Sequence, residues 1–230
     1  EISAGCILIA SGVEYKSLEI PEFERYEGAG IYYAATEMEA RICSEEDAVI
    51  IGGGNSAGQA AIFLSRSSRQ VHVVIRGDDL GKSMSRYLVD RVEGTPNIHV
   101  HKRHTVAHLD GGDQLSGVVL RDEESGSMRR LPARAMFMFI GAVPRTDWLR
   151  GCVDLDPKGF VLTGSSLPAA TLQNEVWGAV KRPPYFLETS LPGVFAAGDA
   201  RSDSVKRVAS AVGEGSMAIS FVHAHIGAPS

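Results

Sequence analysis

Short apolar runs that end at or near a glycine recur along the chain and predict buried strands. They cover Cys6–Ala10, Ala48–Ile51, Val71–Ile75, Ala135–Ile140 and Val194–Ala197. Apart from His72 these runs are apolar throughout, and apolar runs of this length are typical of parallel strands covered on both faces. A short strand at "NIHVHK" and three further strands are predicted in the middle of the chain, at Thr105–Leu109, Leu115–Arg121 and Arg129–Ala133, separated by the turn sequences "GGD" and "EESG".

Three helices are predicted, and the first two have helical spacing of their apolar residues. The predicted helices are Ser56–Ser65, Ser83–Val92 and Val205–Ala224. Together with the strands they form a βαβαβ pattern, a three-stranded meander and one more parallel strand. This order predicts an α/β fold, in which a Rossmann-like domain with a parallel sheet and a β-meander is inserted into a second α/β domain.

Composition narrows the class of protein. The 230 residues are 44% hydrophobic and 22% charged, with a net charge of −5 and no basic patch, so nucleic acid is not an expected partner. No apolar run approaches membrane-spanning length, and the start of the chain lacks the features of a signal peptide. The three cysteines, Cys6, Cys43 and Cys152, are far apart in sequence, which favours a reducing, cytoplasmic compartment.

A glycine-rich turn follows the second apolar strand. Gly52, Gly54 and Ala57 match G-x-G-x-x-A, the dinucleotide-binding pattern. The first glycine allows a tight turn, the second lets the backbone approach a pyrophosphate, and the small third residue lets helix and strand pack closely. Free N–H groups at the helix start, at Asn55 and Ser56, would face the anion. A dinucleotide site is therefore expected here.

The end of the next strand is where such domains select their nucleotide. A carboxylate there binds a ribose 2′-hydroxyl, whereas an arginine accepts a 2′-phosphate. The sequence places Arg76 at this point and Asp78 two residues later. Arg76 favours NADP, and Asp78 leaves NAD open.

The glycine-rich turn also matches G-x-S-x-G, the nucleophile elbow of α/β-hydrolases, at Gly54 to Gly58. Ser56, Asp199 and His223 follow one another in the order of that catalytic triad. Against a hydrolase, three successive glycines relax a turn that should hold the serine under strain, and no His-Gly-Gly segment precedes it. A serine hydrolase is therefore the less favoured alternative.

A second cofactor signal lies near the end of the chain. A buried strand stops at Gly198-Asp199, and a helix rich in small residues begins soon after. A carboxylate at this position can accept a hydrogen bond from a polyol hydroxyl, and the helix start can stabilise negative charge on a ring.

These stretches together resemble the thioredoxin reductases and thioredoxin reductase-like flavoproteins, over nearly the whole chain. The resemblance depends on "CILIASG", "GAGIYYAAT", "IIGGGNSAGQAA", "VHVVIRGDDL", "FMFIGAVPRT" and "LPGVFAAGDA". It implies an FAD-binding domain in two partial segments, residues 1–35 and 146–230, around an NAD(P)H-binding domain at 36–145. The connectors Gly28–Thr36 and Gly141–Thr146 are the expected hinges.

The resemblance also implies the site residues. Gly52, Gly54, Asn55, Ser56 and Ala57 would bind the NADPH pyrophosphate, Arg76 the 2′-phosphate, and Ile140 and Gly141 would flank the nucleotide. Those implied for FAD are Ser11, Gly12, Gly198, Asp199, Lys206, Arg207 and Val208. No metal ligands and no catalytic acid, base or nucleophile are assigned.

Two departures from the family pattern stand out. The glycine turn that opens the family's FAD domain is missing before Gly52, so the chain is expected to be truncated at its N-terminus and inactive by itself. Ala34 and Glu37 stand where thioredoxin reductases carry Cys-x-x-Cys. The dithiol relay, which passes electrons to a protein disulfide by thiolate exchange, is therefore absent.

The expected function is hydride transfer from NADPH to FAD and on to an unknown acceptor, such as ferredoxin, flavodoxin, a quinone or a small oxidant. A non-catalytic, NADPH-responsive redox sensor stays open as an alternative. The segment 163–187, together with "NSAGQAA" and "SVKRVASAVGEGS", resembles a subgroup of reductase-like modules fused behind regulatory or sensor domains. A homodimer is expected. His99, His101, His104 and His108 are expected to be solvated side chains rather than metal ligands.

Overall fold

The computed structural model describes residues 3–227 and divides into two compact units. Unit 1 joins the first segment, up to Glu14, with the segment that starts at Ala142. Unit 2 is the continuous stretch Tyr15–Gly141. The chain passes between them along β2 (Val13–Tyr15) and β11 (Ala142–Pro144), which pair in a two-stranded sheet. The units divide at these points, whereas the sequence had placed boundaries at 35/36 and 145/146.

Unit 2 is built on a five-stranded parallel sheet in the order β3-β10-β4-β5-β6. The strands are β3 (Ile31–Tyr32), β4 (Asp47–Ile51), β5 (Gln70–Ile75), β6 (Ile98–Lys102) and β10 (Ala135–Met138). β4 is buried along its whole length, as its unbroken apolar run predicted. The pairing of β3 with β10 puts the connector Gly28–Thr36 inside this unit, so the expectation of a hinge there is not met.

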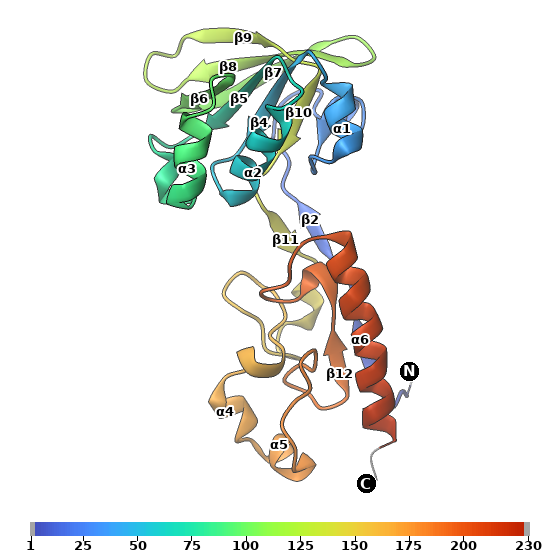
Figure 1. The fold of residues 1–230 in the computed structure, drawn as a ribbon. Helices are drawn as coiled ribbons and strands as arrows, with labels where there is room; N and C mark the ends of the chain where they lie inside the picture. Colours follow the sequence, from blue (N-terminus) through green and yellow to red (C-terminus); the bar gives the residue numbers. More distant parts are fainter. Residues whose placement is uncertain (1–2, 228–230) are drawn as a thin grey trace. The chain divides into compact units, whose positions relative to one another are not determined.

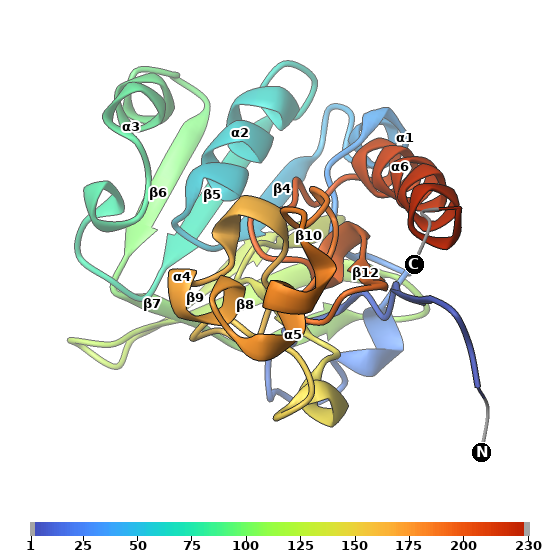
Figure 2. The ribbon, with the colours of Figure 1, turned by 90° about the horizontal axis from the view of Figure 1, so that it is seen from below.

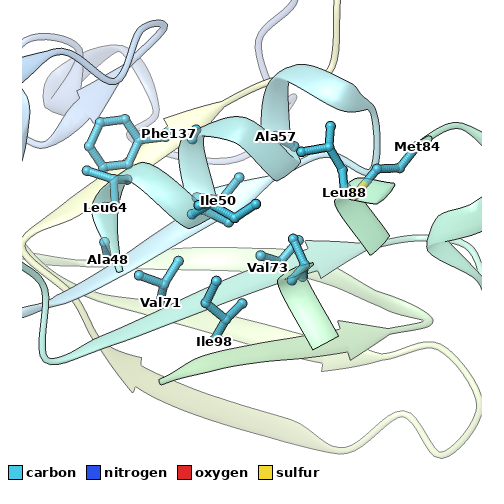
Figure 3. Packing of buried hydrophobic residues seen from close by; sticks show 14 of the residues in the cluster. Ala48, Ile50, Ala57, Leu64, Val71, Val73, Met84, Leu88, Ile98 and Phe137 are labelled. Carbon is cyan, nitrogen blue, oxygen red and sulfur yellow. The ribbon is translucent and has the colours of Figure 1, made fainter. Parts of the chain in front are cut away.

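Helices cover one face of the parallel sheet and a meander covers the other (Figures 1 and 2). The helices are α2 (Asn55–Leu64) and α3 (Arg86–Glu93), and the antiparallel meander consists of β7 (His104–Gly111), β8 (Leu115–Asp122) and β9 (Met128–Pro132). Figure 3 shows Ile50, Val73 and Phe137 of the sheet packed with Ala57 and Leu88 of the helices. A second apolar cluster fills the space between the sheet and the meander. The Rossmann-like architecture with a three-stranded meander is thereby confirmed.

Unit 1 is organised around two parallel strands, β1 (Ile7–Ile9) and β12 (Val194–Ala196). The long helix α6 (Val208–Ile226) packs on β12 through Ala218, Phe221 and Val222. No helix in residues 3–227 is long and apolar enough to cross a membrane.

Several short elements of the structure were not predicted. In unit 2 they are η1 (Glu24–Tyr26), α1 (Glu37–Ile42) and η2 (Leu80–Lys82); in unit 1 they are η3 (Asp147–Leu149), η4 (Gly164–Ser166), α4 (Ala169–Leu172), α5 (Glu175–Val180) and η5 (Gly198–Ala200). The Thr36 hydroxyl and the Glu39 carboxylate form a capping box that starts α1. The helix α3 begins at Arg86 instead of Ser83. The Ser83 hydroxyl and the Ser85 N–H form hydrogen bonds with Gly53 and Asn55 instead.

Candidate functional site

The glycine turn between β4 and α2 leaves no room for a side chain at its first position, Gly52. Gly52 has φ +136°, and a Cβ atom there would lie 2.4 Å from the carbonyl oxygen of Phe139. A Cβ atom on Gly58, in the first turn of α2, would lie 2.8 Å from Sδ of Met84. Ala57 is fully buried in the helix-side core, where it lets α2 pack closely on the sheet. The sequence motif therefore forms the tight strand–turn–helix that its spacing predicted.

The start of α2 is open. Gly54 is the N-cap residue and has no side chain to cap the helix, and Asn55 and Ser56 are exposed. The first N–H groups of a helix have no partner within the helix itself. With their partial positive charge, these groups form a surface that suits an anion.

A neighbouring loop braces the turn. The Ser83 hydroxyl donates to the carbonyl oxygen of Gly53 at 2.8 Å, and the Ser85 N–H donates to Oδ1 of Asn55 at 2.7 Å. The Asn55 side chain thus holds the loop in place. Sequence reasoning missed Ser83 and Ser85, because serines in a polar loop carry no signal of their own.

Arg76 lies just beyond the end of β5. It is exposed and has no hydrogen bond or ion pair in residues 3–227. Lys82, in contrast, pairs with Asp78 at 2.6 Å, and this hydrogen bond raises the pKa of Lys82 and lowers that of Asp78. Arg76 is therefore the cation at this strand end that is free to meet a phosphate.

Ile140 and Gly141 follow β10, the strand next to β4 in the sheet. Gly141 has φ +96° and is exposed, while Ile140 packs partly against the core on the meander side. Since β4, β5 and β10 are parallel, their carboxyl ends meet at one edge of the sheet. The structure thus gathers the predicted nucleotide residues of unit 2 where doubly wound sheets bind ligands.

The candidate residues of unit 1 gather in the same manner. β1 and β12 are parallel with Ile9 opposite Ala196, so Ser11 and Gly12 lie at the same end as Gly198 and Asp199. The hydroxyl oxygens of Ser11 and Ser204 are sealed from solvent and have no hydrogen-bond partner. Orphaned buried hydroxyls are uncommon in folded proteins, and these two are covered by the protein itself.

Lys206, Arg207 and Val208 lead into α6. The Lys206 ammonium lies 3.4 Å from the carbonyl oxygen of Asp199 and 4.2 Å from the centre of the Phe160 ring, and burial lowers its pKa. Arg207 is the N-cap residue of the helix, with an extended backbone, and Val208 is 83% exposed. The helix therefore begins three residues later than predicted.

An ion pair that the sequence analysis did not predict supports this end of unit 1. Arg201 and Glu214 are both largely buried and pair with each other, and Glu214 Oε2 also accepts a hydrogen bond from the Gly198 N–H at 2.7 Å. The two residues are thirteen positions apart. Only the packing of α6 against η5 brings them together.

The two positions at which thioredoxin reductases carry Cys-x-x-Cys hold no cysteine in this chain. Ala34 precedes the start of α1 and Glu37 is its first residue, exposed. The nearby Cys43 is fully buried and accepts a hydrogen bond from the Ser68 hydroxyl. Burial raises the pKa of the Cys43 thiol, which therefore stays protonated and unreactive at neutral pH.

The geometry of unit 1 contradicts the hydrolase alternative. Gly198, next to Asp199, lies against Ala211 of α6. His223 is twelve residues further along this helix, which is about 18 Å at 1.5 Å per residue. Asp199 and His223 cannot form a hydrogen bond across this distance. Ser56 sits inside α2 with an ordinary negative φ, without the strain of a nucleophile elbow.

Comparisons with known proteins agree with this arrangement. The family model described as "Pyridine nucleotide-disulphide oxidoreductase" matches residues 1–215. Thioredoxin reductase from Streptomyces clavuligerus is 31% identical over 212 residues, which are 92% of this chain and 59% of that protein. A "34.2 kDa protein in rubredoxin operon" of Clostridium pasteurianum is 27% identical over 221 residues, 96% of this chain and 64% of that protein.

Solved structures show the same fold. The crystal structure of thioredoxin reductase from Streptococcus pyogenes superposes with a TM-score of 0.75 at 25% identity, over 96% of this chain and 65% of that one. Thioredoxin reductase from Giardia duodenalis reaches a TM-score of 0.77 at 22% identity, over 97% and 66% of the two chains. The chain thus spans about three fifths of the length of the first two thioredoxin reductases that it matches in sequence. It belongs to the pyridine nucleotide-disulphide oxidoreductase family, in which thioredoxin reductases use FAD and NADPH.

Proposed function

We propose that the full-length protein takes a hydride from NADPH, passes the electrons to FAD and delivers them from the reduced flavin to an acceptor. No Cys-x-x-Cys pair of the protein takes part in this transfer. The observation that carries this proposal is the Gly52 turn, which has no room for a Cβ atom, beside the open start of α2 and the unpartnered Arg76. These three features are at one edge of the sheet and suit the pyrophosphate and the 2′-phosphate of one nucleotide.

The roles of the residues in unit 2 follow from their positions. Gly52, Gly54 and the N–H groups of Asn55, Ser56 and Ala57 would hold the pyrophosphate, and Arg76 would hold the 2′-phosphate. Ile140 and Gly141, which follow the neighbouring strand, would flank the rest of the nucleotide. NADPH supplies the hydride, while the protein supplies binding and orientation.

Unit 1 would hold FAD through Ser11, Gly12, Gly198, Asp199, Lys206, Arg207 and Val208. The parallel pairing of β1 and β12 supports this assignment, because it brings Ser11 and Gly12 to the same end of the sheet as Gly198 and Asp199. Glu214 and Arg201 would not touch the ligand; they would position the Gly198 backbone.

The acceptor is proposed to be one that reduced flavin can serve directly, because no second cysteine accompanies Cys43 in unit 2. Ferredoxin, flavodoxin, a quinone or a small oxidant fits this requirement, and thioredoxin, the substrate that names many of the relatives, does not. A homodimer in the cytoplasm stays a prediction.

Two measurements test the proposal. NADPH titrated into this chain should bind, whereas the Arg76→Gln variant should bind it more weakly. The visible spectrum of the full-length protein should show a flavin band that bleaches on anaerobic addition of NADPH. A band that persists would contradict hydride transfer and favour the redox-sensor alternative. No band, even after FAD is added, would overturn the FAD assignment.

A further inference from the structure

Unit 2 contains a polar cavity that the proposed function does not use. Its volume is about 510 Å³, and its lining includes His72 of β5, His99 and His101 of β6, Arg129 of β9 and Glu93 of α3. Since β5 and β6 are paired with His72 opposite His99, these imidazoles lie side by side on one face of the sheet. His101 is only 8% exposed, which corrects the expectation that this histidine is solvated.

Three buried polar side chains of the parallel sheet form a line toward the cavity. Oδ2 of Asp47 lies 3.7 Å from Nε2 of His72, and Nδ1 of His72 lies 3.0 Å from Nε2 of His101. The Asp47 carboxylate favours a proton on the nearer nitrogen, His72 Nε2. His72 Nδ1 then accepts, and His101 Nε2 donates.

This proton order leaves Nδ1 of His101 as the one basic nitrogen of the pair. It has no hydrogen-bond partner among the described residues, and it is not one of their sealed orphan atoms, which are the Ser11, Tyr26 and Ser204 oxygens. The nitrogen therefore has access to solvent on the side of the cavity. A ligand there can complete its hydrogen bonding.

The charges around the cavity are unbalanced. Arg129 has no ion pair in residues 3–227, whereas Glu93 faces Lys102 at 3.8 Å and Asp47 faces Arg69 at 2.9 Å. Burial, followed by the charges of His72 and Arg129, lowers the pKa of His101 to about 4. Burial is also the main cause that lowers the pKa of His72, against the opposing effect of Asp47. An anion in the cavity would favour the charged form of His101 and so raise the pKa of its imidazole.

Other charged groups also face the His72–His101 pair and affect how strongly an anion would bind there. The titratable or charged groups on the surrounding elements are Asp47 on β4, His72 on β5, His99 and Lys102 on β6, His104 on β7, Arg129 on β9 and Glu93 on α3. Glu93 and Asp47 are already paired, so the unpaired charge is positive. Residues 3–227 contain no group of three or more His, Cys, Asp or Glu side chains arranged to hold a metal ion.

We propose that this cavity is an anion site for a phosphate group, free or carried on a small metabolite, held by the Arg129 guanidinium and by His101 protonated at Nδ1. A tetrahedral oxoanion has enough acceptor oxygens to bond to both donors at once. His101 takes its proton from solvent as the anion binds. Binding therefore consumes a proton and becomes tighter as the pH falls.

Sulfate is the first probe, because it stays a dianion between pH 5.5 and 7.5. In calorimetric titrations of this chain, sulfate should bind at least about tenfold more tightly at pH 5.5 than at pH 7.5. Titrations in buffers of different ionisation enthalpy should reveal that binding takes up a proton. The imidazole resonances of His72 and His101 should shift on addition of sulfate, which separates this site from Arg76 and the start of α2. Inorganic phosphate and phenyl phosphate then distinguish a free from an esterified ligand.

Arg129→Gln should abolish the sulfate-dependent shift of the His101 resonances, since it removes one of the two donors. Arg130→Gln is the matched control, because Arg130 is the next residue of β9 and pairs with Asp110. Both arginines are exposed, so both variants should fold. The proposal is overturned if His101 does not respond to sulfate, if affinity is the same at both pH values, or if Arg129→Gln behaves like Arg130→Gln.

Discussion

A Cβ atom on Gly52 would lie 2.4 Å from the carbonyl oxygen of Phe139, closer than two non-bonded atoms can approach. The contact joins the turn after β4 to the end of β10. The two strands therefore come together at the nucleotide edge with backbone against backbone, and only glycine fits at position 52.

Gly52→Ala is expected to destabilise unit 2 and weaken NADPH binding. The φ of +136° and the clash together should cost at least about 2 kcal/mol. Thermal unfolding of the chain should show a melting temperature lower by roughly 5–10 °C. Gly112→Ala is the control, because a Cβ atom on Gly112 meets nothing within 4 Å. Equal melting temperatures for the two variants would contradict this interpretation of the turn.

Arg76→Gln should lower affinity for NADPH without changing affinity for NADH. A hydrogen-bonded charge pair contributes about 1.5–3 kcal/mol, which corresponds to a loss of roughly tenfold to a hundredfold. Binding constants for both nucleotides, measured by fluorescence, test this. Lys82→Gln should have the smaller effect, since Asp78 already neutralises Lys82. A parallel loss of NADPH and NADH affinity would show that Arg76 does not read the 2′-phosphate.

Glu188→Gln should destabilise unit 1 by about 3 kcal/mol, because it leaves the partly buried guanidinium of Arg182 without its carboxylate partner. The Glu188 carboxylate is fully buried and accepts two hydrogen bonds from Arg182, at 2.7 and 2.9 Å, and one from the Gly193 N–H. Both tryptophans, Trp148 and Trp177, are in unit 1, so their fluorescence during urea unfolding reports on this unit. Glu175→Gln, at an exposed helix start, is the control.

The same carboxylate predicts a pH dependence. Burial acts to raise the pKa of Glu188, but the hydrogen bonds from Arg182 and the backbone outweigh burial and lower it. A lowered pKa contributes stability above the unfolded value of about 4.3, and this stability is lost as the pH falls through the folded value. The stability difference between the wild type and Glu188→Gln should therefore be largest near neutral pH and shrink below about pH 4. A difference that grows in acid would contradict this assignment.

The cysteines should differ in reactivity according to burial. With a thiol reagent such as DTNB at pH 7.5, the exposed Cys152 should react promptly and the partly buried Cys6 more slowly. Cys43 should react only after unfolding, because burial raises the pKa of its thiol. In the full-length protein, NADPH should release no additional pair of thiols. Two new thiols on reduction would show that a dithiol relay exists after all.

The sequence by itself determined the parts of the fold that depend on near neighbours. The apolar run of β4, the glycines of the turn and the spacing of α2 are all local, so the strand–turn–helix could be predicted, and Arg76 with it. Short elements were missed for the opposite reason: α1 is six residues long, and its capping box at Thr36 and Glu39 precedes only a weak apolar pattern. In such helices tertiary packing supplies the stability that length does not.

Only the tertiary structure decided which distant side chains meet. His72 and His101 are 29 residues apart and form a pair because β5 and β6 are neighbours in register. Arg201 reaches Glu214 because α6 folds back over η5, and Asp199 is held far from His223 by the straight length of that same helix. Periodicity records which face of an element is buried, but the partner across that face is chosen by sheet order and helix packing, which no local pattern encodes.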